Sequence, residues 1–217
     1  MIVDLNLQSK RIVVVGGGKE AEKRINSLLN QDCETLVISD SINTQIKKLV
    51  RTKKIKLKTQ KVQDTKFISQ LKPDIIVTTT NNKKLNQKII NSAKRKKIIV
   101  YSSDNPEESD FSNPSIIDFE KIIQIAIFTG GQSPAMSKKI KTKSENLFRK
   151  IITHEDISHI KIQNTARKLA KEIIHTQPQR KEYLHNIMTD NTIDQLIKDG
   201  QMNKAEKRAI AILRNWK

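Results

Sequence analysis

The sequence has little cysteine, few aromatic residues and no long apolar segment. Its single cysteine, Cys33, excludes an internal disulfide and a cysteine-based metal cluster, as is common in proteins of a reducing compartment. No apolar run approaches the roughly 20 residues that cross a bilayer, and the chain starts without a basic leader and apolar segment. We therefore expect a cytoplasmic protein with no membrane partner. With aromatic residues at only 4%, few platforms remain on which nucleic-acid bases could stack.

Acidic residues are also scarce. The 217 residues include 41 Lys and Arg against 23 Asp and Glu, a formal net charge of +18. Such a charge attracts polyanions, among them nucleic acids, acidic membranes and small molecules with several carboxylates. A lysine-rich, solvated surface accounts for much of the charge equally well. Because no nucleic-acid-reading motif accompanies it, we expect no nucleic-acid partner.

Half of the six glycines stand together in one turn. They follow the apolar run Ile12–Val15 and precede a helix-forming segment, and Gly16, Gly18 and Ala21 match the G-x-G-x-x-G/A dinucleotide-binding pattern. Gly16 permits the sharp turn, Gly18 lets backbone approach a pyrophosphate, and Ala21 lets the helix pack closely. The free amides at the start of the helix then face the anion. We expect the cofactor's pyrophosphate at Gly16, Gly17, Gly18 and Lys19.

An acidic residue ends the second predicted strand, Thr35–Asp40. Asp40 lies 24 residues after Gly16, about the distance that suits a hydrogen bond to the ribose 2′-hydroxyl of NAD. Its charge would repel the 2′-phosphate of NADP, so the sequence favours NAD. The alternative is that Asp40 only ends a strand or starts a turn.

Short apolar strands continue to alternate with helix-like segments. We expect strands at Ile55–Lys58, Pro73–Thr80 and Ile98–Tyr101 and helices at Asp64–Leu71 and Leu85–Lys94. This order predicts an α/β fold with a parallel sheet covered on both faces, in which ligands bind at the carboxyl ends of the strands. Thr78, Thr79 and Thr80 lie at such an end and are candidate cofactor contacts. A Thr/Asn cluster at that position is as often a helix cap.

The pattern changes after Asn105. A turn-rich connector leads to two predicted strands, Ser115–Asp118 and Ile122–Phe128, and then to a second glycine-rich loop at Thr129–Pro134. From Ala135 onward apolar residues recur only at helical spacing. This spacing predicts about four helices, with breaks at Pro178 and Gly200.

Several of these segments together resemble one family. Val15–Gly18, Asp104, Asn113–Asp118 and Thr129–Ala135 are similar, in the same order, to the motifs of the precorrin-2 dehydrogenase family, the dehydrogenase and chelatase part of siroheme synthases. The Pro-Ser-Ile-Ile-Asp block followed by Gly-Gly-x-Ser-Pro is the most specific part. The resemblance runs from about Leu5 to Leu147, and the helical tail agrees in length and class only.

The resemblance implies three parts: a Rossmann domain at 1–113, a small α+β dimerisation segment at 114–147 that exchanges strands in a homodimer, and an all-helical domain at 148–217. It also implies NAD-dependent oxidation of precorrin-2 to sirohydrochlorin, and some family members then insert ferrous iron or cobalt. Because precorrin-2 is a polycarboxylate, the basic composition gains a second explanation.

The resemblance also suggests roles for individual residues. It implies that Asp104 is catalytic, since a carboxylate there could accept a proton as hydride leaves the macrocycle. The alternative is an Asx-type turn at Asp104–Pro106. The second glycine loop could bind a substrate carboxylate, or it could only lead into a helix at Pro134. The candidate substrate contacts are Asn113, Ser115, Thr129, Gly130, Gly131 and Ser133.

We expect no fixed metal site. His154, His159, His175 and His185 lack a second histidine or carboxylate at the i+4 position on one face. Two alternatives to the enzyme stay open. One is a non-catalytic NAD-sensing Rossmann module, and the other is a nucleic-acid binder attracted by the positive charge.

Overall fold

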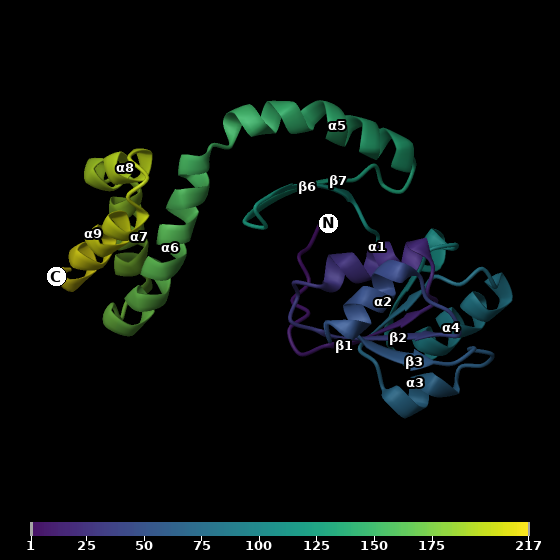
Figure 1. Ribbon diagram of the computed structural model, residues 1–217. Coiled ribbons are helices and arrows are strands. Elements are labelled where there is room, and N and C mark those ends of the chain that lie inside the picture. Colours follow the sequence, from purple (N-terminus) through teal and green to yellow (C-terminus); the bar gives the residue numbers. More distant parts are fainter. Residues whose placement is uncertain (1, 217) are drawn as a thin grey trace. The chain divides into compact units, whose positions relative to one another are not determined.

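The computed structural model describes residues 2–216, and the chain divides into two compact units, one up to Asn113 and the other from Pro114 onward. The first unit alternates strands and helices (Figure 1). Its elements are β1 (Arg11–Val15), α1 (Lys19–Leu28), β2 (Glu34–Ser39), α2 (Thr44–Arg51), β3 (Lys56–Thr59), α3 (Lys66–Leu71), β4 (Ile75–Thr78), α4 (Lys83–Arg95), β5 (Ile99–Ser102) and the 3-10 turn η1 (Pro106–Glu108). The five strands pair in parallel in the order β3-β2-β1-β4-β5, which confirms the predicted α/β fold.

Both faces of this sheet are buried, as its nearly continuous apolar strands require. Val13 and Val15 of β1 lie in an apolar cluster with residues of α3 and α4. Ile12 and Val14 point to the opposite face and lie in a cluster with residues of α1 and α2. Because side chains alternate along a strand, a single run of four apolar residues supplies both cores.

The helix α2 has no counterpart in the sequence prediction. Asn43 caps it by accepting a hydrogen bond from the Ile46 amide at 2.9 Å, and Ile46 is its only buried residue. Eight residues with one buried apolar side chain give too short a pattern for periodicity to reveal. The cap fixes the chain just after Asp40.

The second unit contains a hairpin and helices. Its elements are β6 (Ser115–Phe119), β7 (Ile123–Ile127), α5 (Pro134–Ile151), α6 (His154–Ile173), α7 (Gln177–Met188), α8 (Asn191–Lys198) and α9 (Met202–Arg214). The two strands pair antiparallel, and α5 packs on them (Figure 1). The predicted boundary after Leu147 falls inside α5.

The described residues from Pro134 onward form five helices, one more than the spacing predicts. The apolar residues of α7 and α8 keep similar spacing, but α7 ends at Met188, and Asp190 caps α8 by accepting a hydrogen bond from the Ile193 amide at 2.9 Å. Pro178 lies in the first turn of α7, and Gly200, with φ +70°, separates α8 from α9. The break expected at Gly200 therefore falls between two helices, whereas Pro178 lies inside α7, in the first turn, where a proline is tolerated.

Tyr183 of α7 lies at the centre of the core formed by α6 to α9. It has no exposed surface, and its hydroxyl donates to the backbone oxygen of Ala209 at 3.0 Å. Burial raises the pKa of Tyr183 to about 12. Trp216 packs edge-on against its ring, with centroids 5.5 Å apart.

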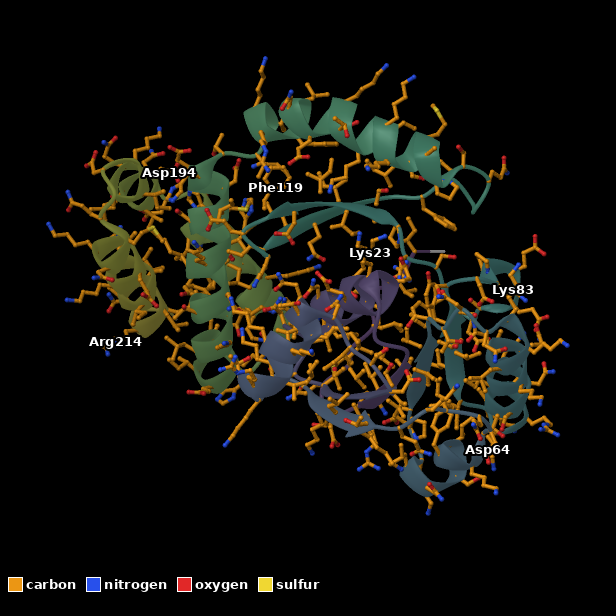
Figure 2. All side chains as sticks on the ribbon, turned by 45° about the vertical axis from the view of Figure 1, so that its right-hand side comes forward. Lys23, Asp64, Lys83, Phe119, Asp194 and Arg214 are labelled. Atoms are coloured by element: carbon orange, nitrogen blue, oxygen red, sulfur yellow. The ribbon has the colours of Figure 1, made fainter. Side chains whose placement is uncertain are left out.

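Charged side chains remain outside both cores. Figure 2 shows nitrogen-tipped side chains projecting from the helices of each unit. Across residues 2–216, each helix is too short or too polar to span a membrane.

Candidate functional site

The first glycine of the turn after β1 is required by backbone geometry. Gly16 has a φ of +118°, which side-chain-bearing residues rarely adopt. A Cβ at this position would lie 2.5 Å from Oγ1 of Thr79. The Gly16 amide donates to the Ile38 oxygen at 3.0 Å and ties the turn to the end of β2. The predicted tight turn is present, with β2 and β4 on either side.

The second glycine is required for a reason that the motif did not reveal. A Cβ on Gly17 would lie only 2.0 Å from the backbone oxygen of Ser41. The Asn43 amide also donates to the Gly17 oxygen at 3.0 Å. Gly17 therefore lets the segment after Asp40 pack directly against the turn.

The third glycine faces open space. No atom lies within 4 Å of a Cβ placed on Gly18, and its φ of −86° is an ordinary value. Gly18 is the N-cap of α1 and offers no side chain to the first amides of the helix. Those amides remain available to an anion, so the residues fit a dinucleotide pyrophosphate. Lys19 is exposed at the same helix end.

Glu20 adds a negative charge in the first turn of α1, but neighbouring bases offset it. Lys23 donates to its carboxylate at 3.1 Å, and Arg24 donates to the other oxygen. Burial raises the pKa of Glu20, whereas the hydrogen bonds from Arg24 and Lys23 lower it by more, so the net shift is downward. The carboxylate therefore stays paired within α1.

Asp40 follows β2 directly, at the same sheet edge as the glycine turn. Val15 pairs with Ile38 in the sheet, so both loops leave the strands at the same level. The side chain of Asp40 is exposed, and the Ser41 hydroxyl lies 3.5 Å from its Oδ1. The carboxylate is free to accept a hydrogen bond from a ribose.

The three candidate threonines occupy different environments. Thr78 has no exposed surface, and its hydroxyl donates to Oδ1 of Asn86 at 2.5 Å, so its side chain has no contact to offer a cofactor. Thr79 lies half-buried beside Gly16, and its hydroxyl donates to the Val15 oxygen at 3.0 Å. Thr80 is also half-buried and donates to Asn86 at 2.6 Å. Only Thr79 and Thr80 reach the surface of the edge.

The cap of α4 comes from a different residue. Asn82 accepts a hydrogen bond from the Leu85 amide at 3.0 Å, so the alternative reading of this cluster holds for Asn82. Asn86, buried within α4, binds two threonine hydroxyls and donates to the Thr80 oxygen at 2.8 Å. The sequence predicts that the Thr/Asn cluster, Asn86 included, contacts the cofactor or caps a helix, whereas the structure shows that Asn86 ties two threonines of this edge together.

Asp104 lies at the next strand end along the same edge. It follows β5 by two residues, is exposed, and accepts a hydrogen bond from the Ser102 hydroxyl at 2.6 Å. Thr78 pairs with Ser102 across β4 and β5. The sheet therefore brings the glycine turn, Asp40, Thr79 and Asp104 to one edge, as parallel topology predicts.

The candidates in the glycine-rich loop of the second unit form a closed turn. Gly130 and Gly131 have φ values of +65° and +79°. The Thr129 hydroxyl lies 3.1 Å from both the amide and the oxygen of Ser133. Ser133 caps α5 by accepting a hydrogen bond from the Met136 amide at 3.2 Å. The loop is thus a tight turn that leads into α5, and the exposed backbone of Gly130 and Gly131 is the part that remains open to a ligand.

Two candidates flank the division between the units. The side chain of Asn113 hydrogen-bonds the phenol of Tyr101, whose pKa is raised chiefly by burial. Ser115 begins β6 and pairs with Ile127 of β7.

Within residues 2–216, no group of three or more His, Cys, Asp and Glu side chains is arranged to hold a metal. His159 instead lies 2.9 Å from Asp194 of α8.

Comparison with known proteins agrees with this geometry. Residues 3–115 match a family model described as "Putative NAD(P)-binding". The siroheme synthase of Actinobacillus pleuropneumoniae serotype 7 is 25% identical over 211 residues, which cover 97% of this chain and 42% of that protein. The siroheme synthase of Vesicomyosocius okutanii is 32% identical over 142 residues, covering 65% of this chain and 30% of that one. The chain thus spans less than half the length of these curated relatives.

Solved structures show the same fold. The structure of SirC, a precorrin-2 dehydrogenase, superposes with a TM-score of 0.70 at 20% identity, covering 97% of this chain and 99% of that one. The parallel sheet with its glycine turn defines a Rossmann-type NAD(P)-binding protein. The chain belongs to this NAD(P)-binding family.

Proposed function

We propose that this protein oxidises precorrin-2 to sirohydrochlorin with NAD in siroheme biosynthesis. The observation that carries the proposal is the placement of a carboxylate, Asp104, at the same sheet edge as a glycine turn that fits a dinucleotide. Relatives named siroheme synthase support the pathway, and the fold shared with a precorrin-2 dehydrogenase supports the reaction. A pure NAD-binding module would give no reason for the carboxylate.

We propose a separate role for each group of residues along the carboxyl ends of the strands. Gly16, Gly17, Gly18 and Lys19 hold the pyrophosphate through backbone amides and one cation. Thr79 and Thr80, half-buried at the same edge, would contact the cofactor. Bound NAD supplies the hydride acceptor. Asp104 accepts the proton that leaves the macrocycle together with the hydride, and the substrate loses two electrons in total.

We propose NAD rather than NADP as the cofactor. Asp40 is exposed at the end of β2, and no basic side chain of residues 2–216 forms an ion pair with it. An unneutralised carboxylate accepts a hydrogen bond from a ribose 2′-hydroxyl and repels a 2′-phosphate. The choice between the two cofactors is therefore electrostatic.

The positive charge suits a polycarboxylate substrate. With a net charge of +18, the protein would raise the local concentration of precorrin-2 and speed its capture at low ionic strength. Asn113, Ser115 and the open backbone of Gly130 and Gly131 are our candidate contacts for its carboxylates. Each offers amides or a hydroxyl, which are suitable donors for a carboxylate.

We also propose a homodimer formed through α5. Four apolar side chains at helical spacing stay exposed along this helix: Met136 (45%), Ile140 (38%), Leu147 (57%) and Ile151 (60%). The neighbouring stripe, which includes buried Ser137 and partly buried Phe148, faces the hairpin. A second copy would cover the exposed stripe and remove its apolar surface from water.

The test is an anaerobic incubation of the purified protein with precorrin-2 and either NAD or NADP. The proposal predicts sirohydrochlorin absorbance with NAD and a much slower reaction with NADP. Ferrous or cobaltous ion is then added to the same cuvette, and metal insertion would appear as a second spectral change. Tight NAD binding without any sirohydrochlorin would identify an NAD-sensing module instead.

A further inference from the structure

A fully buried serine lies beneath the exposed carboxylate of Asp104. Ser102, the last residue of β5, has no exposed surface, and its hydroxyl donates to Oδ1 of Asp104 at 2.6 Å. Within residues 2–216 this is the only hydrogen bond of the Ser102 hydroxyl, and Oδ2 of Asp104 accepts none. The two carboxylate oxygens therefore have different environments.

The backbone of Ser102 is fixed from both sides. Ser102 pairs with Thr78 in the sheet, and the amide of Ser103 donates to the Thr78 oxygen at 3.0 Å. On the other side, the Ser109 hydroxyl accepts from the Ser102 amide at 2.9 Å and lies 3.3 Å from the Ser102 oxygen. The donor to Asp104 is thus mounted on the rigid end of a strand, whereas Asp104 itself belongs to a loop.

The loop is braced elsewhere, but not at the carboxylate. Asn105 donates to Oε1 of Gln87 in α4 at 3.3 Å, and Gln87 donates to Glu108 at 3.0 Å. Lys94 of α4 lies 3.6 Å from the same Glu108 carboxylate. These contacts hold the course of the loop and leave the side-chain torsions of Asp104 free. Among the described residues, Ser102 alone binds this carboxylate and restricts its rotation.

We propose that Ser102 is a positioning residue for Asp104, an inference that rests on the proposed function. By binding Oδ1, the buried hydroxyl limits rotation of the carboxylate and leaves Oδ2 to accept the proton from the substrate. Held groups react faster than mobile ones because less orientational freedom is lost on reaching the transition state. Ser102 touches neither substrate nor cofactor and acts through Asp104.

The test is a double-mutant cycle on the full-length protein, with precorrin-2 and NAD as substrates. Ser102→Ala should lower kcat about tenfold and leave the KM for NAD unchanged, because orientation is lost but the cofactor site is intact. Asp104→Asn should lower kcat further. Adding Ser102→Ala to Asp104→Asn should then change nothing, since the serine has lost the group that it positions.

Ser92→Ala is the matched control, because Ser92 is another buried serine of this unit and lies in α4, outside the site. Should Ser102→Ala fail to fold, Ser102→Cys replaces it, since a thiol has nearly the same size but donates weakly. Equal multiplicative losses in both backgrounds, or an unchanged kcat, would overturn the positioning role. An inactive wild-type protein would overturn both this role and the proposed function. An active wild-type protein with an unaffected Ser102→Ala variant would overturn the positioning role alone.

Discussion

Gly17 and Gly18 are neighbours in one turn, yet the structure gives them separate tasks. A side chain on Gly17 would meet the Ser41 backbone at 2.0 Å, whereas a side chain on Gly18 would meet nothing within 4 Å. Gly17 therefore serves packing within the protein, whereas Gly18 borders open space, where we propose that the pyrophosphate binds. The motif G-x-G-x-x-G/A treats the middle position as unrestricted, so it could not reveal the first of these tasks.

This separation leads to a paired prediction. Gly17→Ala should lower the free energy of unfolding of the ligand-free protein by about 1 to 3 kcal/mol, as overpacking against backbone does. Gly18→Ala should cost less, about 0.5 to 1 kcal/mol, as expected when alanine replaces a glycine N-cap, but should weaken NAD binding at least about tenfold by filling the pyrophosphate space. Urea unfolding and isothermal titration with NAD measure the two effects. Equal NAD affinity in Gly18→Ala and wild type would show that the pyrophosphate lies elsewhere.

At the scale of elements, sequence periodicity predicts most of the strands and helices of the first unit but misses α2. The strands of the sheet and α1 and α4 carry at least two buried apolar residues each, apart from β3, where only Leu57 is partly buried. The helix α2 buries Ile46 alone, and its Asn43 cap is its clearest signal. Likewise, the separation of α7 from α8 depends on the Asp190 cap, because the apolar spacing continues across it.

The exposed stripe on α5 gives a prediction at this scale. Wild-type protein should behave as a dimer by light scattering coupled to size exclusion, and Leu147→Glu should yield monomers, because a charge would be buried against apolar neighbours. Thr142→Glu is the control, since Thr142 is exposed on a different side of the same helix. A wild-type mass near 24.9 kDa at every concentration would exclude the dimer.

The buried phenol of Tyr183 gives a pH prediction for the helical core. Its pKa of about 12 in the folded protein exceeds the ordinary value of 10.0, so above pH 10 the unfolded chain ionises first. This difference in pKa contributes about 2 to 3 kcal/mol to the free energy of unfolding, which is fully present below pH 10 and is lost as the pH rises towards 12. Tyr183→Phe should cost about 1 kcal/mol at neutral pH, from the lost hydrogen bond to Ala209, and should decline less steeply above pH 10.

Trp216, the only tryptophan, packs on Tyr183, so its fluorescence during urea unfolding reports on this core. Identical declines in stability from pH 10 to 12 in wild type and Tyr183→Phe would refute the raised pKa. Ala209 supplies a backbone acceptor, which no substitution of its side chain removes, so the tyrosine is the side to change.

At the scale of the whole molecule, the sequence predicts the α/β class and the edge where ligands gather, because parallel strands end together. It does not predict which polar residues at that edge face solvent. Thr78, Thr79 and Thr80 are the same residue type and cannot be told apart in the sequence. Thr78 is buried because it pairs with Ser102 of β5 and contacts Asn86. The tie from Ser102 to Asp104 is local in sequence, but its significance appears only once Ser102 is known to be buried.

Our central proposal is that the protein oxidises a tetrapyrrole with NAD held at the glycine turn and with Asp104 as the base. Its most direct test is the ratio of NADH to sirohydrochlorin formed by the wild-type protein from precorrin-2 and NAD without oxygen, compared with Asp104→Asn. The account predicts one NADH for each sirohydrochlorin, and a variant that binds NAD normally but turns over at least about a hundredfold more slowly, as for lost general-base catalysis. Sirohydrochlorin formation by Asp104→Asn at the wild-type rate, or tight NAD binding with no NADH formed by the wild type, would contradict it.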